Sequence, residues 1–372
     1  LSHNLLKIML EALTGERLRA ALVGIGAAAI IQSSAATSVT VTGALNAGII
    51  QLSAALAVIL GANLGTTVTA QIIASNLTGV APFFIFAGAL YYFLAPKARY
   101  KNQGIALFAF GLLFVGLSMM SASIAELSRN GSARDLFAYL GAMPLIAIIA
   151  GAIITIFLRS SSSATGLVIA FALGGLVDIQ AGIYLVIGIN LGGCLTTLIA
   201  GIGTNPANKQ LALGNVMFNT GGLLIALAMV PLYLEKLPLL SDSLPRQIAA
   251  AHTLFNLVIL VVFLPLLPLI VRLLERVVPG ETDKKQEIRY LSENLISTPY
   301  LAIMAVIREL TVMLSLCRGM LDKAEACIVA YNHKLKNEII FDEESVDEMQ
   351  KNITHYLVEI TRNDLTERQQ RL

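Results

Sequence analysis

A polar motif occurs twice in this chain, at one spacing and inside segments that are otherwise apolar. Gln-Ser-Ser at 32–34 precedes Gly-Ala-Asn-Leu-Gly at 61–65, and 127 residues later Arg-Ser-Ser at 159–161 precedes Gly-Ile-Asn-Leu-Gly at 188–192. No gap is needed to align the two copies. Duplicated polar segments interrupted by glycine are typical of transporters built from inverted repeats, in which the binding site lies near the middle of the bilayer.

The composition indicates an all-α integral membrane protein. Of 372 residues, 56% are hydrophobic and 13% charged, whereas about a quarter of the residues in a soluble domain are charged. Residues 20–96 contain no Asp, Glu, Lys, Arg or His. A soluble fold could not bury that much apolar surface, whereas helices that cross a membrane expose it to lipid. The net charge of +2 gives no indication of nucleic acid binding.

Several apolar segments are too short to cross the bilayer. Residues 18–31 would form a helix of about 21 Å, while the hydrocarbon core is about 30 Å thick. Segments 144–158 and 166–176 are likewise too short to cross it. The short segments flank Ser- and Thr-rich tips, at 32–37 and 159–165. We therefore expect one re-entrant helical hairpin in each half, with a non-helical tip that is buried in protein or lines a wet cavity.

The glycine- and asparagine-rich copies of the motif lie within longer apolar segments, 52–75 and 179–200. We expect the glycines to break both transmembrane helices and to free backbone groups for ion coordination. The alternative is that they only allow close helix packing. With two further helices, each half crosses the membrane an odd number of times, so the second repeat would be inverted relative to the first.

The distribution of basic residues supports this topology. One side carries Lys7, Arg17, Arg19, Lys97, Arg99, Lys101, Lys209, Arg272 and Arg276. The other side carries fewer basic residues, and acidic neighbours offset them. The richer side is cytoplasmic by the positive-inside rule, and the C-terminal region falls on that side.

These patterns divide the chain into a first transmembrane repeat at 1–142, a second, inverted repeat at 143–278, and a helical cytoplasmic domain at 279–372. A charged linker follows Pro279, and Pro299 is placed to start a helix at its first turn. A second helix is predicted over 344–362 from its apolar spacing. Two helices cannot close a core, so we expect this domain to be incomplete here.

Together, the motifs resemble the sodium-dependent phosphate cotransporter family, the type II family with its bacterial members. The resemblance covers about residues 5–275 and includes the Phe-Asn pairs at 218–219 and 255–256. The stretch from residue 288 onward looks like a bacterial subgroup that appends a domain similar to the phosphate regulator PhoU. The family implies symport of inorganic phosphate with Na+ by alternating access, in a multi-pass protein of the bacterial inner membrane.

The resemblance also implies the site residues. Phosphate would be held between the two hairpin tips by Ser33, Ser34, Arg159, Ser160, Ser161, Ser162 and Ser163. Sodium would be bound by Gln32, Asn63, Thr66, Thr67, Asn190, Thr196 and Thr197. Helix N-termini behind the tips would add free N–H groups for the anion.

Arg159 departs from the family pattern, which usually has Gln at this position. Intramembrane arginines are rare and costly, which favours a function: facing the anion or replacing a sodium ion. The alternative is that the guanidinium caps hairpin carbonyls or extends to the surface. The substitution puts the family's sodium stoichiometry in doubt for this chain.

Other classes of protein fit less well. A serine hydrolase needs a base, and of the four histidines only His252 lies in a membrane segment, so we expect no enzyme. A phosphate-sensing membrane scaffold and a transporter of another anion, such as sulfate, remain as alternatives. The sequence leaves a homodimer open, along with the direction of transport.

Overall fold

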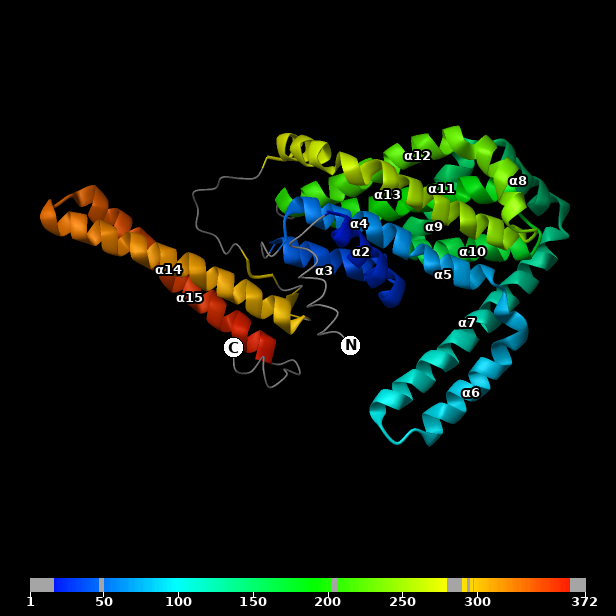
Figure 1. Ribbon diagram of the computed structural model, residues 1–372, viewed down its shortest axis with the longest axis horizontal. Coiled ribbons are helices and arrows are strands. Elements are labelled where there is room, and N and C mark those ends of the chain that lie inside the picture. The colour runs from blue at the N-terminus through cyan, green and yellow to red at the C-terminus, as the bar shows by residue number, and fades with distance from the viewer. Residues whose placement is uncertain are drawn as a thin grey trace.

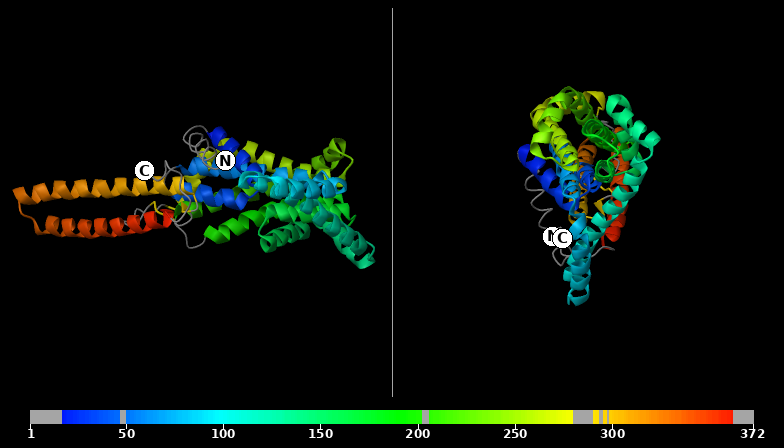
Figure 2. Two further views of the ribbon diagram at one scale, coloured as in Figure 1. Left: turned by 90° about the horizontal axis from the view of Figure 1, so that it is seen from below. Right: turned by 90° about the vertical axis from the view of Figure 1, so that its right-hand side faces the viewer.

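The computed structural model describes residues 17–46, 50–201, 206–279, 290–292, 295–296 and 298–361. Throughout these ranges the chain is helical or irregular and contains no strand. The helices form a bundle from α2 to α13, and α14 and α15 extend from one end of it as a rod (Figure 1). The two further views show the same separation into bundle and rod (Figure 2).

The helices follow the expected order with one addition. The first half comprises α2 (Arg17–Ile31), α3 (Ser34–Asn46), α4 (Leu52–Gly65), α5 (Thr67–Ala74), the 3-10 turn η1 (Leu77–Val80), α6 (Ala81–Leu94) and α7 (Ala98–Ser128). The short helix α8 (Gly131–Ala142) follows at the end of the first half, and the second half comprises α9 (Pro144–Leu158), α10 (Ser161–Leu173), α11 (Ile179–Gly201), α12 (Pro206–Leu240) and α13 (Leu244–Val277). The rod comprises α14 (Pro299–Val329) and α15 (His333–Thr361). Sequence analysis did not anticipate α8.

Seven helices in the described part of the chain are long and apolar enough to cross a membrane. Six of them are the spans expected in the two repeats, with α4 and α5 counted as one, and the seventh is α14. The arms α2, α3, α9 and α10 are too short to qualify singly. An all-α membrane protein is therefore confirmed, while the inverted orientation of the repeats and the re-entrant course of the arms stay predictions.

Although α14 passes this test, its partner helix argues against a membrane position. α15 lies along α14 (Figure 1) and is rich in Asp, Glu and Lys. Lys323 of α14 donates to Asp342 of α15 at 2.7 Å, and this hydrogen bond raises the pKa of Lys323. If α14 lay in lipid, Lys323 and the charged side chains of α15 would lie there too, at a high cost in free energy.

Glycine allows backbone-to-backbone packing of α2 on α4, and the same packing recurs between α9 and α11. A Cβ on Gly61 would overlap the carbonyl oxygen of Ala21, and a Cβ on Gly188 would overlap that of Ile148. Both residues of each pair are separated from their counterparts by 127 positions. Two further contacts between a glycine and a backbone carbonyl are duplicated in the same way. Gly24 lies against Val58 as Gly151 lies against Leu185, and Gly65 lies against Ile25 as Gly192 lies against Ala152. The duplicated sequence therefore has a duplicated packing register.

The expectation of broken helices is wrong for α11, which stays helical through the second glycine motif. In the first half the interruption is limited to Thr66, whose φ of −66° and ψ of −20° are helical and whose N–H still donates to Ala62 at 3.0 Å. The glycines serve close packing, which was the alternative. Because that packing needs a regular backbone, the helical hydrogen bonds are retained and the backbone groups are not freed for ion coordination.

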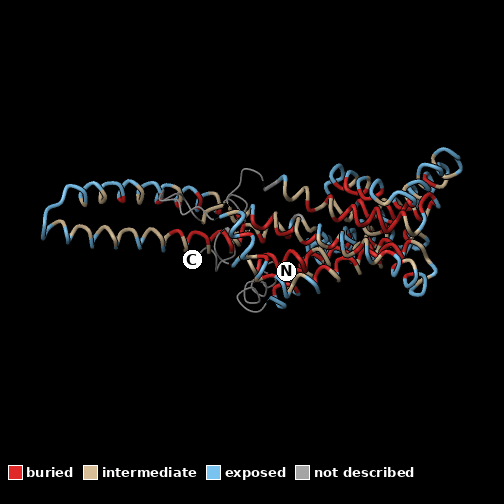
Figure 3. The backbone as a smooth tube through the Cα atoms, turned by 90° about the horizontal axis from the view of Figure 1, so that it is seen from above, coloured by how far each residue is buried: buried red, intermediate tan, exposed pale blue. Residues whose placement is uncertain are grey.

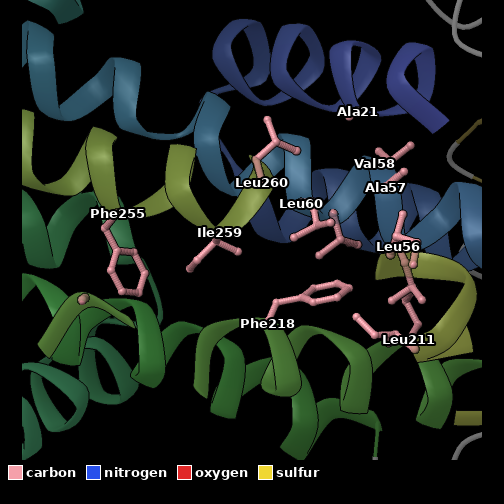
Figure 4. Packing of buried hydrophobic residues seen from close by; sticks show 14 of the residues in the cluster. Ala21, Leu56, Ala57, Val58, Leu60, Leu211, Phe218, Phe255, Ile259 and Leu260 are labelled. Carbon is pink, nitrogen blue, oxygen red and sulfur yellow. The ribbon is translucent and has the colours of Figure 1, made fainter. Parts of the chain in front are cut away.

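The two halves share one hydrophobic core. Figure 4 shows Phe218 of α12, Leu60 of α4 and Ile259 of α13 close together, and all three are almost fully buried. The hairpin arms also pack across the halves, since α3 contacts α12 of the second half, and α10 contacts α5 of the first half. Neither hairpin therefore packs only within its own repeat.

The pair α6 and α7 projects from the bundle (Figure 1). Its outer surface carries exposed aromatic side chains, among them Phe83, Phe86 and Phe93. In a soluble protein such a surface would favour aggregation, whereas in a bilayer it faces lipid tails.

The rod is buried at its base and exposed toward its far end (Figure 3). At the base, Tyr356 donates its hydroxyl to the carbonyl oxygen of Ser292 at 2.6 Å, and burial raises the pKa of Tyr356 to about 12. Leu295, 1% exposed, lies against Gly43 of α3, where any Cβ would meet its side chain. The base of the rod thus contacts the first hairpin.

Pro299 begins α14 as expected, but α15 begins at His333 rather than near residue 344. Packing and ion pairing along α14 extend this helix through a stretch whose apolar spacing is weak. The predicted linker at 281–287 and the basic residue Lys7 lie outside the described residues.

We predict that Gly61→Ala destabilises the protein, because the added methyl group would overlap the backbone of α2. Overpacking of this kind costs about 1–3 kcal/mol or more. Gly26→Ala is the matched control, since nothing lies within 4 Å of a Cβ built there. Thermal unfolding in detergent should show a lower Tm for Gly61→Ala alone, and equal Tm values would contradict the packing described here.

Candidate functional site

The two hairpin tips share an uncommon backbone turn. Gln32 ends α2 with a φ of 56°, and Arg159 ends α9 with a φ of 52°. Both residues donate their N–H to the carbonyl four residues earlier, at 2.8 Å in each case. Left-handed backbone is costly for residues other than glycine and is often found at functional sites. Its occurrence at the same place in both repeats favours a shared role.

A serine begins the next helix in both tips. Ser33 Oγ accepts from the N–H of Ala36 at 3.1 Å, and Ser160 Oγ accepts from the N–H of Ser163 at 3.2 Å. These N-caps start α3 and α10 directly behind the turn, so the non-helical tips are shorter than 32–37 and 159–165. The first N–H groups of each helix have no intrahelical acceptor and carry partial positive charge.

Both tips reach one cavity of about 60 Å³, which is larger than a single water molecule requires. Its walls come from α3, α4, α9, α10, α11 and α12, and therefore from both halves. The lining residues are Ser34, Ser38, Asn63, Thr66, Thr155, Arg159, Ser160, Ser161, Asn190, Gly193, Cys194, Thr196, Thr197, Asn215 and Asn219. They include a cationic guanidinium and no carboxylate.

Most of the residues expected at the site line this cavity. Of the phosphate set these are Ser34, Arg159, Ser160 and Ser161, and of the sodium set Asn63, Thr66, Asn190, Thr196 and Thr197. The others do not line it: Gln32, Ser33, Thr67, Ser162 and Ser163. The geometry accounts for several of these. The Oγ of Ser33 is engaged as a cap, Thr67 donates to Leu64 O, and Gln32 and Ser163 are exposed.

Sequence reasoning missed other polar residues of the lining. Asn215 and Asn219 lie one turn apart on α12, so they share a face of an apolar helix. That spacing is a signal that could have identified both. Ser38 and Thr155 lie one turn from the tips, on α3 and α9. Helical periodicity counted outward from each tip would have included them.

Hydrogen bonds separate the lining hydroxyls into two kinds. Thr66 donates to Asn63 O at 2.8 Å, and Thr196 donates to Gly193 O at 2.7 Å. Thr155 and Thr197 likewise donate to carbonyls of their own helices. Because their protons are used, these oxygens can only accept, as a cation requires.

The serine hydroxyls differ, since neither the hydroxyl of Ser34 nor that of Ser161 has a hydrogen-bond partner among the described residues. Ser160 uses its oxygen as a cap acceptor but keeps its proton. These three residues can donate to an anion.

The side chain of Arg159 also has no hydrogen-bond or ion-pair partner in the described ranges. It is exposed as well as lining the cavity. An unpaired cation here is available to an anionic ligand. The same ranges contain no cluster of His, Cys, Asp or Glu that could hold a metal ion.

The lining asparagines are held by neighbouring helices. Asn63 donates to Asn215 Oδ1 at 3.2 Å, joining α4 to α12. Asn190 accepts from Asn256 of α13 at 3.2 Å, and His252 lies 3.3 Å from the same oxygen. All of these polar side chains except Asn63 are buried.

Comparisons with known proteins point in one direction. The family model described as Na+/Pi-cotransporter matches residues 1–122 and 118–262, and a PhoU domain model matches residues 310–371. No solved structure matches the chain significantly.

Two curated relatives cover most of this chain. It is 29% identical over 288 residues to YjbB of Escherichia coli (strain K12), whose name describes a proposed inorganic phosphate export protein. That match covers 77% of this chain and 53% of YjbB, so the chain spans about half the length of this relative. It is also 28% identical to YqeW of Bacillus subtilis (strain 168), named an uncharacterized protein, over 76% of this chain and 91% of YqeW.

We predict that Ser34→Ala and Ser161→Ala each weaken binding of inorganic phosphate about tenfold or more, because each removes a hydrogen bond to a charged ligand. Ser163→Ala, exposed and outside the cavity lining, should have a smaller effect. Isothermal titration of purified protein in sodium-containing buffer measures all three. Equal losses in the three variants would mean that the cavity is not the binding site.

Proposed function

This chain belongs to the Na+/Pi-cotransporter family, and we propose that it carries inorganic phosphate across the membrane by symport with Na+. The cavity between the two hairpin tips is the binding site in this proposal. The observation that carries it is the convergence of both copies of the duplicated motif on one cavity with a free guanidinium and no carboxylate.

The anion side of the site consists of donors. Phosphate carries one or two negative charges at neutral pH, and Arg159 with the Ser34, Ser160 and Ser161 hydroxyls can donate to its oxygens. The N-termini of α3 and α10 add backbone N–H groups and partial positive charge. Because Arg159 is the one full positive charge in the lining described above, release remains feasible once sodium has left.

The cation side consists of oxygens. The hydroxyls of Thr66, Thr196 and Thr197 accept only, because each proton is bound to a carbonyl. Na+ prefers such oxygens, and a cation bound close to phosphate offsets its charge in a medium of low dielectric constant. Binding of either ion would then favour binding of the other, which is the basis of coupling.

Alternating access would follow from movement between the halves. In this proposal 1–142 and 143–278 form inverted repeats with re-entrant hairpins, and the C-terminal domain is cytoplasmic. Because α3 packs on α12 and α10 packs on α5, a shift of one half carries a hairpin arm of the other. Such a shift would open the cavity to one side while closing it to the other.

The direction of net transport depends on the gradients, since a coupled carrier is reversible. The name of YjbB refers to export. An inward sodium gradient would drive import through a symporter.

The two alternative functions predict other results. A phosphate sensor would bind without flux, and a carrier of another anion would transport sulfate in preference to phosphate.

Flux of labelled phosphate in proteoliposomes tests the proposal. We expect an inward sodium gradient to accelerate uptake, replacement of sodium by potassium to abolish the acceleration, and excess sulfate to leave it intact. An outward gradient should drive efflux at a comparable rate. Binding without sodium-driven flux would reject transport, and competition by sulfate would reject phosphate as the preferred substrate.

We further predict that Arg159→Gln raises the half-saturating phosphate concentration about tenfold or more, because a charged hydrogen-bond donor is lost. A sodium ion would then have to replace the missing charge, so the sodium dependence of flux should steepen. Arg129→Gln is the control, since that arginine pairs with Glu126 on α7 and does not line the cavity. Identical sodium dependence and transported charge in both variants would exclude this role for Arg159.

A further inference from the structure

Asn63 and Asn190 are equivalent in the two repeats and both line the cavity, yet neighbouring helices occupy the amide oxygen of Asn190 and leave that of Asn63 free. Asn190 donates its Nδ2 to the backbone carbonyl of Val186 at 2.9 Å. A carbonyl oxygen can only accept, so this bond determines which end of the Asn190 amide is the nitrogen.

The oxygen of Asn190 is then occupied by α13. Asn256 donates to it at 3.2 Å and also donates to the carbonyl of His252 at 3.0 Å. The second bond orients the Asn256 amide for the same reason. His252 Nε2, at 3.3 Å from the Asn190 oxygen, must therefore carry a proton. With two donors on its oxygen, Asn190 has one N–H left, and that group is available to the cavity.

Asn63 differs in its oxygen. Asn219 donates to the backbone carbonyl of Asn215 at 2.9 Å and to its Oδ1 at 3.1 Å, which identifies that atom as oxygen. Asn63 must therefore face it with Nδ2, at 3.2 Å. Asn63 also keeps one N–H, but unlike Asn190 its own oxygen has no partner among the described residues and is available to the cavity.

We propose that Asn190 binds phosphate rather than sodium, and that His252 and Asn256 are positioning residues that turn its N–H toward the anion. This inference rests on the proposed function and changes the role expected for Asn190. Asn63, by contrast, offers an oxygen to sodium. The donor of Asn190 lies in the same half as Arg159.

The burial of the cluster supports a positioning role. His252 and Asn256 are each 1% exposed, and Asn190 is 9% exposed. Within the described residues His252 Nδ1 and Asn256 Oδ1 are buried without a partner. Buried polar groups are normally paired. In this cluster two acceptors are left unpaired, while the donors of His252 and Asn256 are both directed at the Asn190 oxygen.

The positioning role is tested with His252→Phe, which keeps a ring but removes the donor. We expect the half-saturating phosphate concentration for flux to rise about tenfold, the effect of one buried hydrogen bond. The half-saturating sodium concentration, measured at saturating phosphate, should change less than about twofold. His252→Gln retains an N–H donor and should restore phosphate affinity to within about threefold of wild type.

Thr253→Val provides a matched control on the same helix. It removes the hydrogen bond from Gln71 of α5 to Thr253, at 2.9 Å, which lies outside the cavity lining. Neither half-saturation constant should change. A response equal to that of His252→Phe would show that any loss of contact along α13 has the same effect, and would overturn the proposal.

Asn190→Asp tests the ligand directly and does not depend on the stability of the His252 variants. The carboxylate can still accept from His252 and Asn256, but it has no N–H for the anion. We expect phosphate binding by isothermal titration to weaken about a hundredfold. Retained phosphate binding with tighter sodium binding would identify Asn190 as a sodium ligand and overturn the proposal.

Different results would reject the proposed function and the role of Asn190. Absence of sodium-driven phosphate flux in the wild-type protein would reject the proposed function. Normal wild-type flux combined with a change in sodium rather than phosphate affinity in His252→Phe would reject only the role of Asn190. Unchanged values for both ions in that variant would reject it as well.

Discussion

Backbone contact between helices, made possible by glycine, positions everything else in the bundle. α2 packs on α4 through Gly24, Gly61 and Gly65, and α9 packs on α11 through their counterparts. In a bilayer, where lipid tails are as apolar as side chains, such close van der Waals packing is a main source of helix association. It fixes the position of the first arm of each hairpin, so that the two tips reach one cavity, through Ser34 in the first half and Arg159 in the second.

The chemistry of the cavity depends on how its polar groups are already bonded. Threonine hydroxyls that donate to their own helices become acceptors, while the tip serines keep their protons. One set of ordinary side chains can thus offer donors to an anion and oxygens to a cation. The same logic distinguishes Asn63 from Asn190, because α12 holds one amide and α13 holds the other.

Much of the fold and of the site could be predicted from local pattern. Segment length indicated the hairpin arms, and the repeated motif indicated Ser34, Arg159, Ser161 and Asn63 as lining residues. The broken helices were wrong, because a glycine that breaks a helix and a glycine that admits a neighbouring helix look the same in sequence. The tips were shorter than expected because Ser33 and Ser160 act as caps, which depends on backbone geometry.

The sequence by itself determined the membrane class, the duplication and the residue types brought to the tips, because hydropathy and spacing are local properties. Only the tertiary structure decided which of those residues share a cavity. Asn215 and Asn219 enter it from α12, and Thr67 is left outside. Which atom of each side chain remains free was decided in the same way, since a hydrogen-bond partner such as His252 comes from a helix far along the chain.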